Sequence, residues 1–404
     1  MVFDSKKNKI IFFTGIILCI LALVVAGVSF SIYFSNMGNK KGFEVIDYVS
    51  TSKYNNNVSL TYYLDDSDGM SIPSKTKLIQ NYYSAAIIDF YTAADEYTPI
   101  DGYVNLGYIN THPNEEIVIY DFLYDALYDA YEKTISEDSN YSLFSGYLNY
   151  FWFNNYQNYD LANIVEYDPL FNDTENEKLL LYTDIAKNRN LVDLEFYPDN
   201  KIKLVVDESL INLEEKLYLD FNYLKDAYAL EYIASQLIEN NFTKGYLTSQ
   251  TGLSIKLGEI PSSIEYSYYL NELGDGFKYT LNKKYRIANL TTFKFNNAYG
   301  YSVEKDSRVY ERYFYFDFNM VDSLSIINSI QGSSCDKFLY DLVFETHQIL
   351  INTSKNDIKN KIKNSSTTFI LSDRSNICYT NNFDNNISYN LKNCTLKGVD
   401  LFEE

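Results

Sequence analysis

The sequence predicts one α+β domain that follows an N-terminal transmembrane helix. Three observations support this: an apolar segment without charges near the N-terminus, strand and helix patterns along the remaining chain, and the lack of an internal repeat or a low-complexity insert. A chain of 404 residues has room for two domains, but an uninterrupted body favours a single large core.

The apolar segment Ile10–Phe34 carries no charge, and lysines at positions 6, 7 and 9 precede it. Its length suits a helix that spans the bilayer with some tilt. Because a cleaved signal peptide has a shorter apolar core, we expect a retained signal anchor. Residues 1–9 then form a short cytoplasmic N-terminus, residues 35–42 a tether, and residues 43–404 a body outside the cytoplasm. The protein is thus expected in the cell membrane as a single-pass protein.

The net charge of −20 argues against two classes of partner. Nucleic acids and anionic lipid surfaces both attract clusters of Lys and Arg, whereas acidic residues outnumber basic ones here by 54 to 34. We therefore expect no nucleic-acid partner, and contact with the membrane through the anchor.

The first part of the body begins with strand-like alternation over Val45–Tyr63, followed by a helix over Lys77–Asp89. A second helix is predicted over Ile119–Lys133. A hairpin is predicted over Leu191–Val206, with its turn at Pro198-Asp199-Asn200.

The second of these helices carries three aspartates spaced four residues apart, at Asp121, Asp125 and Asp129. Such a row suits a cation site. Like-charged rows on a helix are nevertheless usually solvated, and we favour that interpretation.

The stretch Leu217–Gly258 organises the rest of the chain. A short apolar strand, Leu217–Leu219, is expected to end at Asp220, and a helix follows it. A strand resumes at Gly245–Leu247, and Thr251-Gly252 marks a turn. The apolar residues of the helix recur at the spacing of one buried face: Leu230, Ile233, Ala234, Leu237 and Ile238. The pattern alone indicates an ordinary β-α-β core unit.

Downstream, a helix is predicted over Cys335–Leu350 and a final hairpin over Thr367–Tyr379. Strands are predicted over Ala288–Phe295, Arg308–Phe318 and Ser323–Asn328.

Three cysteines lie beyond the anchor. Cys378 and Cys394 are the nearer pair, and an oxidising compartment allows them to form a disulfide that leaves Cys335 free.

Common catalytic motifs are absent from the sequence. It has no Gly-x-Ser-x-Gly, no phosphate-binding glycine loop and no Cys/His pair at zinc spacing. Its two histidines, His112 and His347, are far apart in the chain, and we expect both to be structural.

The central stretch resembles that of the FAD:protein FMN transferase family, called ApbE. That family carries Asp-Leu-Gly-Gly-x-x-Lys-Gly-Tyr-x-x-Asp, a helix, and then Gly-Gly-Asn/Asp-x-x-x-x-Gly. Asp220 and Tyr228 match this pattern, Glu231 stands at the last acid, Thr251-Gly252-Leu253 takes the glycine turn, and Gly258 closes it. The sequence departs from the pattern at Asn222, Tyr223, Asp226 and Ala227.

The resemblance extends in both directions. Tyr141–Trp152 is similar to a family loop that touches the flavin, and the closing hairpin is similar to the family's last motif. The family binds its metal with Ala-Asp-x-x-x-Thr at a helix start. Here Asp336 matches the metal Asp, Tyr340 replaces the Thr, and Asp341 is a possible stand-in one residue later. An acid in the first turn of a helix is equally well explained as a stabiliser of that helix.

The resemblance implies an Mg²⁺-dependent enzyme that attaches FMN from FAD to a Ser or Thr of a partner protein outside the cytoplasm. It implies that Tyr228, Glu231 and Gly252 bind the cofactor and that Asp336 and Asp341 bind the metal, and it assigns no catalytic residue. Because several motif residues are replaced, a non-catalytic flavin-binding or partner-binding module on the same scaffold is the alternative. A surface adhesin or solute-binding protein is a further alternative.

Overall fold

The computed structural model describes residues 41–48, 58–137, 139–157, 164–258, 264–269, 276–281, 285–291, 300–313, 326–373, 377–382, 387–390 and 395–402. The predicted anchor, residues 10–34, lies outside these ranges. Within the ranges, no helix combines the length and the apolar character needed to cross a membrane.

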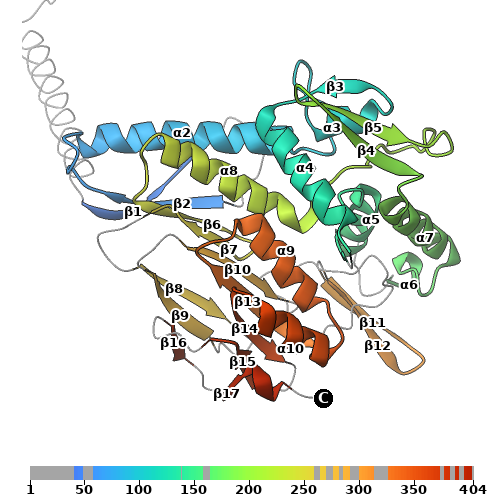
Figure 1. Cartoon of the computed structure of the whole chain (residues 1–404). Coiled ribbons are helices and arrows are strands. Elements are labelled where there is room, and N and C mark those ends of the chain that lie inside the picture. Colours follow the sequence, from blue (N-terminus) through green and yellow to red (C-terminus); the bar gives the residue numbers. More distant parts are fainter. Residues whose placement is uncertain are drawn as a thin grey trace, which may run out of the picture.

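A nine-stranded sheet forms the centre of the molecule (Figure 1). Its strand order is β1-β2-β6-β7-β10-β13-β14-β15-β17. Neighbouring strands are antiparallel except β15 and β17, which are parallel. The strands are β1 Gly42–Ile46, β2 Val58–Leu64, β6 Gly245–Ser249, β7 Leu253–Lys256, β10 Arg286–Thr291, β13 Ile327–Ser334, β14 Thr368–Asp373, β15 Ile377–Thr380 and β17 Thr395–Gly398.

Helices cover one face of this sheet. Helices α2 (Ile72–Ala93) and α8 (Lys225–Glu239) pack against each other over the N-terminal strands (Figure 1). Helix α9 (Leu339–Leu350) packs on β10 and β13, and α10 (Lys355–Asn364) lies beside it. The apolar face predicted for α8 is buried from Leu230 to Leu237, because it is sandwiched between α2 and the sheet.

Smaller elements gather beside the main sheet (Figure 1). The helices are α3 Leu106–Thr111, α4 Asp121–Ile135, α5 Gly146–Gln157, α6 Ile164–Tyr167 and α7 Asp173–Lys187, with short 3₁₀ turns at Asn222–Leu224 and Val399–Leu401. The small sheets are β3-β5-β4 (Glu116–Val118, Lys201–Val206, Val192–Tyr197) and β16-β9-β8 (Ile387–Asn390, Gly276–Leu281, Ile264–Tyr269), with a hairpin β11-β12 (Gly300–Lys305, Arg308–Tyr313).

Most predicted elements are present with shifted ends. The hairpin predicted over Leu191–Val206 is confirmed as β4 and β5, with Asp199 and Asn200 at φ 62° and 55° in its turn. Asp and Asn tolerate this left-handed conformation better than most residues do. The strand predicted from Ser323 is described from Ile327 and continues to Ser334.

Two local predictions are wrong. Leu217–Leu219 is not a strand, because its backbone bonds to a side chain: Leu219 N–H donates to Asn110 Oδ1 (2.8 Å), and Leu219 O accepts from Asn110 Nδ2 (3.1 Å). Helix α9 begins at Leu339, after Phe338 in an extended conformation. Asp336 therefore lies in the turn before the helix and not in its first turn.

The cysteine prediction is confirmed in part. Cys378 is disulfide-bonded, and Cys335 is free and exposed. The predicted partner of Cys378, Cys394, lies outside the described residues, so the pairing itself stays a prediction.

Candidate functional site

Helix α8 stands at the centre of the candidate site. Four of its polar side chains, Lys225, Asp226, Tyr228 and Glu231, each bond to a different distant part of the chain. The segment that resembles the flavin transferase motif therefore also joins α4 to strand β10 of the main sheet.

Asp226, which stands at the place of the motif lysine, forms hydrogen bonds that hold neighbouring elements together. Its side chain is buried and accepts hydrogen bonds from Tyr91 Oη on α2 and from Thr251 Oγ1, both at 2.8 Å. The carboxylate thereby fixes the turn between β6 and β7 to two helices.

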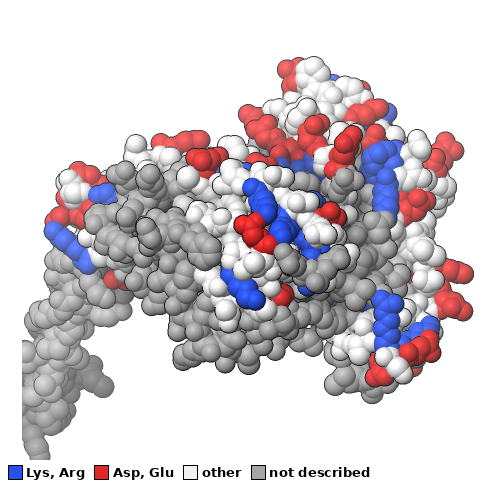
Figure 2. Space-filling model, turned by 60° about the horizontal axis from the view of Figure 1, so that its bottom comes forward, with Lys and Arg blue, Asp and Glu red and all other residues white. Residues whose placement is uncertain are grey.

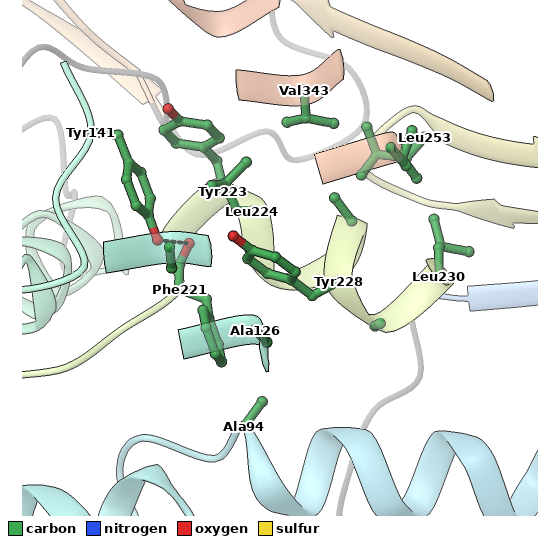
Figure 3. Close-up of a cluster of buried hydrophobic side chains, with 14 of the residues drawn as sticks. Ala94, Ala126, Tyr141, Phe221, Tyr223, Leu224, Tyr228, Leu230, Leu253 and Val343 are labelled. Atoms are coloured by element: carbon green, nitrogen blue, oxygen red, sulfur yellow. Dashed lines mark hydrogen bonds between the residues drawn. The ribbon is translucent and has the colours of Figure 1, made fainter. Parts of the chain in front are cut away.

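Tyr228, a predicted cofactor-binding residue, lies inside the core (Figure 3). It is 4% exposed. Its hydroxyl donates to Asp129 Oδ2 at 2.5 Å, and its ring stacks on Tyr340 with the centroids 4.9 Å apart. Burial and the neighbouring Tyr141 and Asp129 raise the pKa of Tyr228 well above its usual value. The hydroxyl therefore stays protonated and serves as a donor to Asp129.

Glu231, the second predicted cofactor-binding residue, is held by two groups. Its carboxylate makes a bidentate ion pair with Arg286 on β10, including Arg286 Nη2 to Glu231 Oε2 at 2.9 Å. Its Oε1 also accepts from the backbone N–H of Leu339 at 2.6 Å, at the start of α9. Glu231 thus supplies the negative charge that a helix N-terminus favours.

The backbone conformation and close packing at position 252 require a glycine, and Gly252 is the third predicted cofactor-binding residue. It has φ +91°, and a Cβ at this position would lie 2.3 Å from Asn289 O on β10. Asn289 N–H donates back to Gly252 O at 3.1 Å. This close approach explains the glycine without a ligand.

The predicted metal ligands Asp336 and Asp341 have different surroundings. Asp336 is exposed, and its backbone N–H donates to Ser334 Oγ at 3.2 Å. Asp341 lies in the first turn of α9, with Oδ1 2.7 Å from Lys133 Nζ. The described residues hold no group of three or more His, Cys, Asp or Glu side chains arranged for a metal ion. Asp341, already bonded to an ammonium group, does not fit a metal ligand in this arrangement.

Lys133 and Asp129 on α4 are site residues that the sequence analysis missed. Lys133 also pairs with both oxygens of Asp129 at 2.7 Å, so the aspartate row on this helix is not merely solvated as expected. Their spacing of four residues is a visible signal for an ion pair along a helix. The contact between Lys133 and Asp341 joins residues 208 positions apart, so no local sequence pattern predicts it.

A second cluster surrounds the first residue of α8. Lys225 Nζ lies 2.5 Å from Glu96 Oε2, and Asp220 Oδ2 accepts from Asn149 Nδ2 at 2.7 Å. Glu96 is 7% exposed, and burial raises its pKa to about 7 although Lys225 opposes the shift. Lys225 lies one residue before the place of the motif lysine, and this offset is the only local signal of the cluster that is visible in the sequence.

The raised pKa of Glu96 predicts a pH-dependent stability. Because the folded pKa of about 7 lies above the ordinary value of 4.5, the folded state holds this proton more tightly than the unfolded state. The stabilisation is fully present below pH 4.5 and is lost as the pH rises through 7. Glu96→Gln cannot ionise, so wild type should lose several degrees of Tm relative to this variant across that window. Thermal scans of both proteins, followed by circular dichroism, measure the difference; parallel pH profiles would contradict the prediction.

Both histidines have structural environments, as expected. His347 is buried and stacks on Tyr223 with the centroids 3.8 Å apart, and burial lowers its pKa to about 3. His112 stacks on Tyr108 at 4.0 Å.

Solved structures with a similar fold include flavin transferases. The apo flavinyl transferase ApbE of Pseudomonas stutzeri matches with a TM-score of 0.55 at 11% identity, over 83% of this chain and 92% of that one. The flavin transferase ApbE of Vibrio cholerae matches with 0.53 at 11%, over 87% and 96%. The ApbE protein of Thermotoga maritima matches with 0.54 at 11%, over 82% and 94%. The chain has the flavin transferase fold. No protein-family model and no curated protein matches its sequence.

Within the flavin transferase fold, this chain exposes an aromatic side chain at the start of α9. Phe338 is 52% exposed. Its ring stacks on Tyr340 with the centroids 5.2 Å apart, and the guanidinium carbon of Arg286 lies 5.3 Å from its centroid. An exposed ring that stacks on a second aromatic ring offers a platform on which a planar ligand can stack.

Proposed function

We propose that this protein binds FAD at the Phe338 platform of a flavin transferase fold and does not transfer FMN. The observation that carries the proposal is the exposed Phe338 ring, which stacks on Tyr340 and lies beside Arg286. The fold shared with flavin transferases supports flavin as the class of ligand.

FMN transfer needs a base and a cation, and two acidic side chains predicted for this site already form other bonds. A Ser or Thr hydroxyl attacks the FMN phosphorus of FAD, the bond from that phosphorus to the bridging oxygen breaks, and AMP leaves. A base takes the hydroxyl proton, and cations offset the phosphate charge. Here Glu231 is bonded to Arg286 and Leu339, and Asp341 is bonded to Lys133. These bonds favour the non-catalytic alternative over the enzyme.

The active enzyme is the second candidate function. It is an Mg²⁺-dependent transferase that attaches FMN to a Ser or Thr of an acceptor protein outside the cytoplasm, at a membrane to which residues 10–34 anchor it. The exposed carboxylate of Asp336 favours it, because this side chain lies in the turn that precedes Phe338. Asp336 is therefore the side chain on which a metal requirement would depend.

Titration of FAD into the full chain by calorimetry tests the proposal. FAD should bind equally well in Mg²⁺ and in chelator. Phe338→Ala should weaken binding about tenfold, since stacking on an aromatic side chain contributes about 1–3 kcal/mol. Tyr128→Ala is the matched control, because Tyr128 is a similarly exposed ring, 48%, on α4.

The same samples distinguish the candidates. If neither condition gives FAD binding, or Phe338→Ala binds as well as wild type, the proposal is rejected. Release of AMP that needs Mg²⁺, is lost in Asp336→Asn and persists in Asp357→Asn would replace it with the second candidate. Asp357 is the matched acid because it lies exposed in the first turn of α10.

A further inference from the structure

We infer that Lys133 is the resident cation of this site, in the place where a divalent metal is expected from Asp341. Its ammonium nitrogen lies 2.7 Å from Asp129 Oδ1, 2.7 Å from Asp129 Oδ2 and 2.7 Å from Asp341 Oδ1. The side chain of Lys133 is 9% exposed, whereas those of Asp129 and Asp341 are 31% and 42% exposed. The cation is therefore the innermost member of the group.

The surroundings of the ammonium group suit a permanent cation. Lys133 Nζ lies 4.9 Å from the ring centroid of Tyr340 and 5.8 Å from that of Phe344, and aromatic faces attract cations. Tyr228 donates to the second oxygen of Asp129 and holds that carboxylate in position. One lysine thus joins α4 to α9, and Tyr228 links the pair to α8.

The charges explain why the lysine excludes a metal. Asp129 and Asp341 together carry two negative charges, and a divalent ion would balance them fully. With Lys133 in place, that ion would meet an ammonium group at contact distance and would have to displace it. Carboxylate oxygens are the ligands that Mg²⁺ prefers, so removal of the lysine should turn the carboxylate pair into a metal site. This inference does not depend on whether flavin binds.

Thermal unfolding of the full chain, in Mg²⁺ and in chelator, tests the inference. Wild type should show no difference in Tm. Lys133→Met keeps an unbranched side chain against Tyr340 and Phe344 but leaves the two carboxylates unpaired. Its Tm should rise in Mg²⁺ by about 5 °C at a concentration roughly 100-fold above Kd. Adding Asp341→Asn to this variant should abolish the rise.

Two controls decide the remaining outcomes. Lys178→Met removes an exposed lysine that pairs with Glu175 along α7, and it should leave the protein indifferent to Mg²⁺. A folded Lys133→Met protein that ignores Mg²⁺ would overturn the inference. So would an Mg²⁺-dependent rise in the Tm of wild type that persists in Asp336→Asn. If Lys133→Met folds only in Mg²⁺, the inference is supported; if it folds in neither condition, Mg²⁺ cannot replace the ammonium group and the inference is overturned.

Discussion

Replacing Glu231 with alanine is expected to lower the free energy of unfolding by about 3–5 kcal/mol, the cost of leaving a buried ion unpaired. The side chain of Arg286 is 7% exposed, so its charge cannot be hydrated when its partner is gone. The substitution also removes the acceptor of the Leu339 N–H at the start of α9, and loss of such a cap typically costs about 1 kcal/mol.

Equilibrium unfolding in urea measures this loss. Glu231→Gln is the matched control, because an amide oxygen still accepts from Leu339 but no longer neutralises Arg286. We expect its loss to lie between those of wild type and Glu231→Ala. Glu175→Ala removes the half-buried partner of the exposed Lys178 on α7 and should cost less than about 1 kcal/mol. Equal losses for Glu231→Ala and Glu175→Ala would show that the Arg286 pair is not the main support of this junction.

Gly252→Ala is expected to cost about 2–5 kcal/mol, the sum of two contributions. Its φ of +91° is unfavourable for a residue with a Cβ, which accounts for about 1–2 kcal/mol. The new Cβ would also lie 2.3 Å from Asn289 O, so β7 and β10 must separate, and such crowding costs about 1–3 kcal/mol.

Gly69→Ala separates these two contributions. Gly69 has a similar φ of +78°, but nothing lies within 4 Å of the place that a Cβ would take, so only the conformational cost applies. We expect a loss of about 1–2 kcal/mol there and roughly twice that at Gly252. Equal losses at the two glycines would mean that the sheet accommodates the Cβ without strain.

The fold was more predictable from the sequence than the site was. The apolar periodicity of α8 and the turn at Asp199-Asn200 are local properties, and the structure confirms both. Leu217–Leu219 was mistaken for a strand because an apolar run does not show where its backbone bonds go, and here they go to the side chain of Asn110. A local sequence pattern cannot show that Glu231 and Asp341 form ion pairs with residues far away in the chain, Arg286 and Lys133.

The described surface carries charged side chains of both signs. Figure 2 shows acidic and basic side chains intermingled among the described residues of one face.

The strand order of the main sheet constrains the sequence of events during folding. Strand β2 pairs with β1 on one side and with β6 on the other, and the second pairing joins Val58 to Ser249. A two-stranded ribbon is marginally stable alone; α2 packs on β1 and β2 soon after they are synthesised, but the third strand of this part of the sheet arrives only with β6. Until then the edge of β2 that pairs with β6 stays unpaired, and contacts this distant in sequence form slowly. The N-terminal edge of the sheet is therefore where the nascent chain is most vulnerable to aggregation.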